Sequence, residues 1–207
     1  MDNLPGVLCT RKRWRFIDGN SLLGIFPSTD SGMHVCGADK GLLKVGEDGV
    51  IMLASQNPGL QDRAGEVSAT RYGNAVAEAF NGTVYFSDLS SRFGFGDWFL
   101  GLIQARPAGR LLKYDPVAGK ASVMLDGLGF ANGVAVSRDG QFVAVCDTLW
   151  FRCMKQWLKG DKAEQSEILV NNLPGCPDNI RLAPDGTFWV ALQQGSLLYS
   201  SMLSSFR

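Results

Sequence analysis

Three side chains that can bind a hard metal ion occupy the same position of a repeated unit. The unit opens with Asn74, Asn132 and Asp178, and in each copy a glycine follows eight positions later. Two amide oxygens and one carboxylate are donors of the kind that calcium prefers, whereas zinc favours imidazole and thiolate. If the fold brings these positions together, the sequence predicts a calcium site with one negative charge. Asn and Asp are also common at strand entries and turns, so a purely structural role is the alternative.

The repeat predicts how these positions are arranged. Copies cover 74–82, 132–140 and 178–186, a weaker copy covers 24–32, and they begin 46 to 58 residues apart. Short alternating strands separated by turn glycines, repeated at this period, are typical of a β-propeller. A single long sandwich is the alternative, but it would not require the same offset of eight in every copy.

We therefore expect an all-β propeller of four-stranded antiparallel blades, with about four of six blades in this chain. In a propeller the first strand of each blade lines the central channel. The leading residues of the copies would then converge at one channel mouth. Gly24 leads the weaker copy and offers no side-chain ligand, so the predicted metal ligands are Asn74, Asn132 and Asp178.

The second unit carries an insertion at 90–107. From residue 95 onward its apolar residues have the spacing of an amphipathic helix. Placed over the channel mouth, this short helix would offer Phe95, Trp98 and Phe99 as contacts for a small-molecule substrate. A surface helix that packs on its own blade is the alternative.

Composition excludes several classes of partner. Twenty basic residues balance twenty acidic ones, so nucleic acid is not an expected partner, and the basic run at 11–15 is interpreted as a solvated edge strand. No stretch approaches the roughly 18 apolar residues of a membrane span. The first residues lack the pattern of a secretory signal, which predicts a cytoplasmic location for the chain as written.

The remaining reactive residue types are interpreted as structural. The five cysteines are an odd number without metal-ligand spacing, which favours small buried hydrophobic residues; Cys146 and Cys153, which bracket a hairpin, are the one pair to test for a bridge. The only histidine, His34, lies inside a predicted strand. Asn81 begins an Asn-Gly-Thr sequon on a predicted turn and would be glycosylated in a secretory form.

Five segments resemble the plant strictosidine synthase-like family, in the order found there: 37–45, 84–88, 106–116, 130–136 and 172–180. The resemblance covers about 14–192 and implies a six-bladed propeller related to calcium-dependent paraoxonases and gluconolactonases. It also implies a location in the endoplasmic reticulum, the vacuole or the cell exterior. We expect a partial propeller at 1–192 and a divergent, serine-rich tail at 193–207.

The resemblance leaves three functions open. The first is hydrolysis of small esters or lactones, in which the metal polarises the carbonyl and activates water. The second is strictosidine synthase-type condensation of tryptamine with secologanin, which uses a glutamate in a blade that the family places beyond the end of this sequence. The third is a non-catalytic binding module.

Three departures from the family and its relatives lead us to expect impaired activity. The family's metal-binding glutamate belongs to a blade before residue 1, and Ala75 follows Asn74 where the family usually has aspartate. The paraoxonase-type pair of histidines is also missing. With four units against six, we expect a fragment whose open edges favour self-association.

Overall fold

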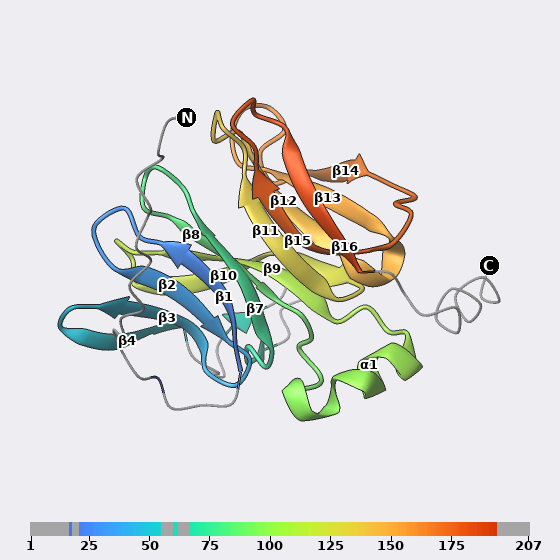
Figure 1. The fold of residues 1–207 in the computed structure, drawn as a ribbon, viewed down its shortest axis with the longest axis horizontal. Coiled ribbons are helices and arrows are strands. Elements are labelled where there is room, and N and C mark those ends of the chain that lie inside the picture. The colour runs from blue at the N-terminus through green and yellow to red at the C-terminus, as the bar shows by residue number, and fades with distance from the viewer. Residues whose placement is uncertain (1–16, 18–20, 55–59, 62–66, 194–207) are drawn as a thin grey trace, which may run out of the picture.

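The computed structural model describes residues 17, 21–54, 60–61 and 67–193 of the 207-residue chain. Three expectations therefore lie outside the described residues: the edge strand at 11–15, the structural role of Cys9 as one of the five cysteines, and the tail beyond Gln193. The described part is built from antiparallel sheets arranged side by side around a common axis (Figure 1).

Three sheets have four strands each, in the order in which the chain supplies them. The first contains β1 (Leu22–Pro27), β2 (Met33–Gly37), β3 (Gly41–Gly46) and β4 (Gly49–Ala54). The second contains β7 (Gly73–Glu78), β8 (Val84–Asp88), β9 (Gly109–Asp115) and β10 (Lys120–Leu128). The third contains β11 (Ala131–Val136), β12 (Phe142–Asp147), β13 (Arg152–Trp157) and β14 (Ser166–Val170).

The fourth unit contributes the hairpin β15 (Cys176–Leu182) and β16 (Phe188–Gln193), and a small hairpin joins β5 (Leu60–Gln61) to β6 (Val67–Ser68). Each expected repeat forms the first strand of a sheet and the turn into the second strand, and the turn glycine of each copy has a φ between 61° and 93°. A side chain at such a φ is strained, which explains why glycine recurs there. The expected fold, a partial propeller of four-stranded blades, is confirmed.

The first strands of the four blades lie next to one another: β1 contacts β7, β7 contacts β11, and β11 contacts β15. The hydrophobic core lies in layers between successive blades rather than in one central mass. One layer joins the second blade to the third and includes Leu111, Leu128, Val134 and Val143. Because each blade is covered by its neighbours, the relative positions of the inner strands are set by this packing.

The expected helical insertion is present between β8 and β9, as a short 3₁₀ turn at Phe95–Asp97 followed by α1 (Trp98–Gln104). The helix ends at Ala105, which has the left-handed conformation that commonly closes a helix. In Figure 1 α1 stands away from the sheets, at the end of the second blade. Within the described residues, no helix has the length and apolar character needed to cross a membrane.

Candidate functional site

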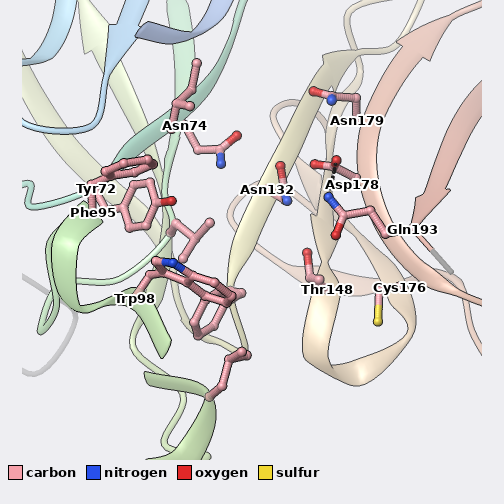
Figure 2. A pocket seen from close by; sticks show the side chains of 14 residues that line it. Tyr72, Asn74, Phe95, Trp98, Asn132, Thr148, Cys176, Asp178, Asn179 and Gln193 are labelled. Atoms are coloured by element: carbon pink, nitrogen blue, oxygen red, sulfur yellow. Dashed lines mark hydrogen bonds between the residues drawn. The ribbon is translucent and has the colours of Figure 1, made fainter. Parts of the chain in front are cut away.

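A pocket of about 630 Å³ lies at the channel mouth where the inner strands β7, β11 and β15 begin. Its polar side is formed by six residues from the second, third and fourth blades: Asn74, Asn132, Thr148, Asp178, Asn179 and Gln193. The structure thus brings the three predicted metal ligands to one pocket. In Figure 2 the amides of Asn74 and Asn132 and the carboxylate of Asp178 lie around the same space.

A β-bulge near the mouth directs these side chains. The strand register shifts between Gly73 and Val76, between Ala131 and Val134, and between Pro177 and Ile180. Each predicted ligand lies inside one of these irregular stretches. Because a bulge tilts the strand and turns side chains away from strict alternation, the same repeat position can point into the channel mouth in three blades.

Close backbone contact brings the third and fourth blades together at this point. A Cβ atom added to Gly133 would lie 2.5 Å from the carbonyl oxygen of Asp178 and 2.5 Å from the amide nitrogen of Ile180. Any larger residue would therefore push β15 away from β11. Gly133 follows Asn132 directly, so the same contact sets the spacing between Asn132 and Asp178.

Asn132 carries a buried, unsatisfied acceptor in the pocket. The residue is only 7% exposed, and its Oδ1 atom is buried without a hydrogen-bond partner among the described residues. Leaving a buried acceptor unpaired costs about 1–3 kcal/mol. A bound ligand that supplies a positive charge or a donor would remove this cost.

Asp178 is held by a residue that sequence reasoning assigned to the tail. The Nε2 atom of Gln193 donates a hydrogen bond to Oδ2 of Asp178 at 2.7 Å. Gln193 is the last residue of β16, directly opposite Cys176 at the start of β15. The carboxylate is thereby fixed through one oxygen, while the other stays available to the pocket.

Two buried aspartates, which sequence reasoning missed, position the strands that carry the asparagines. Asp88 ends β8, and its Oδ1 accepts the backbone N–H of Tyr72 at 2.8 Å. Its Oδ2 accepts Nε of Arg110 at 3.2 Å. Tyr72 lies two residues before Asn74, so this aspartate anchors the chain as it enters β7.

Asp147 has the same place in the third blade. Its Oδ1 accepts the N–H of Gly129 at 2.7 Å, three residues before Asn132, and its Oδ2 accepts Nε of Arg152 at 2.8 Å. Burial raises the pKa of Asp147 to about 6, although Arg152 and the Gly129 N–H oppose this shift. The sequence signal that could have indicated these two residues is an aspartate at the end of the second strand in both the second and the third unit.

The other side of the pocket is apolar and includes the helical insertion. It is formed by Tyr72, Leu89, Phe95, Trp98, Leu102 and Phe130. The rings of Tyr72 and Phe95 meet edge to face, with centroids 5.7 Å apart. Burial, with a smaller effect of the Asp178 carboxylate, raises the pKa of Tyr72.

Two of the three aromatic residues predicted to contact substrate, Phe95 and Trp98, line this pocket, whereas Phe99 is 47% exposed and does not. Gly101 of α1 permits the helix to pack on the pocket, because a Cβ there would lie 3.0 Å from the ring of Phe130. The insertion is therefore part of the pocket wall as well as a helix on its own blade.

Comparison with known proteins finds relatives that are similar over most of the chain. A family model for strictosidine synthase matches residues 74–161. Strictosidine synthase-like protein 13 of Arabidopsis thaliana is 34% identical over 187 residues, which is 88% of this chain and 44% of that protein. Strictosidine synthase-like protein 4 of the same plant is 34% identical over 174 residues, 84% of this chain and 45% of that protein. Over most of its length the chain is similar to strictosidine synthase-like proteins.

Solved structures agree with the propeller fold. A gluconolactonase from Xanthomonas campestris has a TM-score of 0.60 at 17% identity, covering 83% of this chain and 56% of its own. A luciferin-regenerating enzyme has a TM-score of 0.60 at 17% identity, covering 86% of this chain and 57% of its own. Regucalcin from Agrobacterium tumefaciens, a calcium-binding protein, has a TM-score of 0.56 at 16% identity, covering 81% of this chain and 52% of its own. At these identities the likeness is one of fold.

The chain spans less than half the length of those Arabidopsis relatives. Within its described residues, no three His, Cys, Asp or Glu side chains come together as metal ligands. The oxygen donors at the pocket are instead mostly amides, with Asp178 the one carboxylate among the described lining residues. An unpaired amide oxygen beside a carboxylate fits a hard cation better than a soft one.

Proposed function

We propose that this pocket belongs to a hydrolase that acts on small carboxylic esters or lactones with the help of a hard divalent cation such as calcium. The observation that carries the proposal is the buried, unpartnered Oδ1 of Asn132 in a pocket that Asp178 and Asn74 also line. The names of two proteins with a similar fold, a gluconolactonase and a calcium-binding regucalcin, agree with it.

Asn74, Asn132 and Asp178 would hold the cation through their side-chain oxygens. When bound, such a cation polarises a carbonyl group and lowers the pKa of water. Gln193 keeps Asp178 oriented by donating a hydrogen bond to one carboxylate oxygen. The other oxygen is left to bind the cation. Calcium takes six to eight oxygen ligands, so three side chains form a partial set, and we expect low turnover by this chain alone.

The chain's own residues would also bind and orient the substrate. The apolar wall would take the hydrophobic part of an ester or lactone and exclude water from that side, since Tyr72, Phe95 and Trp98 lie there. The polar wall would face the carbonyl group.

Calcium-dependent thermal stabilisation tests this proposal. A ligand that binds only the folded state raises the melting temperature as its concentration exceeds Kd. We expect calcium chloride to raise the Tm of the wild-type chain, and Asn132→Ala and Asp178→Asn to remove the shift. Asn171→Ala, at an exposed position outside the pocket, should keep it. The absence of a shift in the wild type, or its survival in both pocket variants, would overturn the cation site.

Turnover of an aryl ester tests the chemistry separately. We expect hydrolysis that depends on calcium and is lost in Asn132→Ala. Hydrolysis that is unchanged in Asn132→Ala would show that another site is responsible. Calcium binding without any hydrolysis would support a non-catalytic binding module instead.

A second candidate is a carbon–nitrogen bond-forming reaction of the strictosidine synthase type. The aromatic wall of Tyr72, Phe95 and Trp98 favours it, because these rings suit an aromatic amine. Incubation with tryptamine and secologanin, followed by mass spectrometry, separates the two candidates. A condensation product would favour the synthase, and ester cleavage without that product would favour the hydrolase.

The open ends of the arc suggest self-association. Ile25 in β1 is 53% exposed and Trp189 in β16 is 72% exposed, and further apolar residues lie beside each. We propose that these two faces associate in solution, since exposed apolar patches on sheet ends commonly mark contact surfaces. Sedimentation of the wild type should show concentration-dependent dimers or larger species that Trp189→Ser weakens.

A further inference from the structure

We propose that Cys146 and Cys153 form a disulfide across the third blade, which makes this hairpin a site of thiol oxidation. Cys146 in β12 is paired directly opposite Cys153 in β13. Their sulfur atoms lie 3.4 Å apart as free thiols. The inference does not depend on the proposed hydrolase function.

The geometry needs little change to form the bond. Residues directly opposite on antiparallel strands have Cβ atoms about 4.5–5.5 Å apart, and a disulfide needs about 3.5–4.5 Å. The sulfurs already face each other, so a small side-chain rotation and a slight approach of the two strands suffice. The other described cysteines, Cys36 and Cys176, lie in β2 and β15 and have no cysteine paired opposite them.

The chemistry is a two-electron exchange with a small oxidised disulfide such as oxidised glutathione. A thiolate attacks one sulfur of that disulfide and releases a thiol, leaving a mixed disulfide on the protein. The second cysteine, after losing its proton, displaces the second small thiol and forms the Cys146–Cys153 bond. Either cysteine can attack first, because either thiol can donate the hydrogen bond that joins the two sulfur atoms.

Burial determines when the reaction can occur. Both cysteines are fully buried and pack against Ala135, Ala144 and Ile180. An oxidant cannot reach them in the closed protein, so the bond forms during folding or when the outer part of the blade opens. We therefore expect fast oxidation in a refolding mixture and slow oxidation of the folded chain.

The bond would stabilise a loop beside the pocket. Between the two cysteines the chain carries Asp147, which holds Gly129, and Thr148, whose Oγ1 donates to the carbonyl of Pro177 at 2.7 Å. These contacts tie the loop to the entrances of β11 and β15. A disulfide between Cys146 and Cys153 would therefore restrict the loop that contacts the starts of both β11 and β15.

Refolding of the full chain in a mixture of oxidised and reduced glutathione tests the proposal. After alkylation of free thiols, we expect peptide mapping to find Cys146 linked to Cys153. The oxidised protein should melt several degrees above the same protein treated with dithiothreitol, a comparison that needs no variant. Cys176→Ser should retain both the link and the shift, and Cys153→Ala, which does not overpack the buried position, should lose both.

Two results would overturn the inference. One is folded protein in which Cys146 and Cys153 are both alkylated after refolding under oxidising conditions. The other is a link between either cysteine and a different partner, which would show that the paired geometry does not direct oxidation.

Discussion

The guanidinium of Arg181 in β15 donates a hydrogen bond from Nη2 to the backbone carbonyl of Ile25 in β1, at 3.2 Å. The same group lies 5.8 Å from the centre of the Phe26 ring. The two residues belong to the first and last of the four adjacent inner strands and are 156 positions apart. This contact therefore joins the two ends of the described arc across the channel.

Arg181→Ala should destabilise the chain modestly. A hydrogen bond from an exposed charged group contributes about 1 kcal/mol, which corresponds to a fall in Tm of roughly 2–4 °C for a chain of this size. Arg106→Ala removes an equally charged, exposed side chain outside the arc contact and should leave Tm unchanged. Equal effects of the two substitutions in thermal melts would contradict a bridging role for Arg181.

Gly133→Ala should separate the third and fourth blades. The added methyl group would overlap the backbone at Asp178 and Ile180, and overpacking against main-chain atoms costs about 3 kcal/mol. Urea denaturation should show this loss. Gly96→Ala is the matched control, because a Cβ there would have no atom within 4 Å. If Gly133→Ala were as stable as the wild type, the contact between β11 and β15 would not be close enough to set their spacing.

Asp147 should make the chain less stable as the pH rises. Its pKa is raised from 3.8 to about 6 in the folded state, so the folded protein holds this proton more tightly than the unfolded protein. The stabilisation is complete below about pH 4 and is lost as the pH rises through 6. From this group alone the free energy of unfolding should fall by about 2–2.5 kcal/mol between pH 4 and pH 7.

Urea denaturation of the wild type and Asp147→Asn across that pH range checks this slope, which the variant should lack. Asp30, whose pKa is lowered to about 2 by Lys44 and Ser28, acts in the opposite direction and only below about pH 4. The effects of Asp147 and Asp30 on stability therefore fall in different pH ranges. Parallel pH profiles for the wild type and Asp147→Asn would contradict the burial effect.

Trp98 and Phe99 should differ in their effect on an apolar substrate. Both are about equally exposed, at 44% and 47%, but only Trp98 lines the pocket. If the chain hydrolyses an aryl ester, Trp98→Ala should raise KM about tenfold, since a buried aromatic contact is worth roughly 1–1.5 kcal/mol. Phe99→Ala should leave KM within twofold. The reverse order would place the substrate on the outer face of α1.

Asn81 should be modified if the protein enters the secretory pathway, as we propose from its relatives. The side chain is exposed, and its Oδ1 accepts the N–H of Thr83 in a tight turn. Expression in plant cells behind a secretory signal should give a glycan-sized mass increase that glycosidase treatment removes. Thr83→Ala should abolish the increase while Asn81 remains in place. An unmodified secreted chain would refute this acceptor site.

The repeat made the architecture predictable because it combines two independent signals. Alternating apolar residues define the strands, and Gly82 and Gly140 adopt the positive φ that their hairpins require. The same register located Asn74, Asn132 and Asp178 at one mouth, since corresponding positions of successive blades must converge. The alternation within each strand and the repetition between blades therefore predicted the same arrangement.

The finer structure of the site depends on features without a periodic signature. The bulges at the strand entrances arise from pairing between strands, and the contact of Gln193 with Asp178 joins a residue to one fifteen positions earlier. The role of Phe99 was predicted from helical spacing alone, which cannot tell whether a side chain faces the pocket or the solvent. Asp88 and Asp147 could have been found, because an aspartate closes the second strand in both units.

The two walls of the pocket are encoded differently. The polar wall draws on three blades, so a change there alters several packed interfaces at once. The aromatic side chains at its edge, Phe95 and Trp98, come from one contiguous insertion that α1 closes. Replacing that single segment would therefore change the aromatic part of the pocket and leave the inner strands with their oxygen-rich mouth in place.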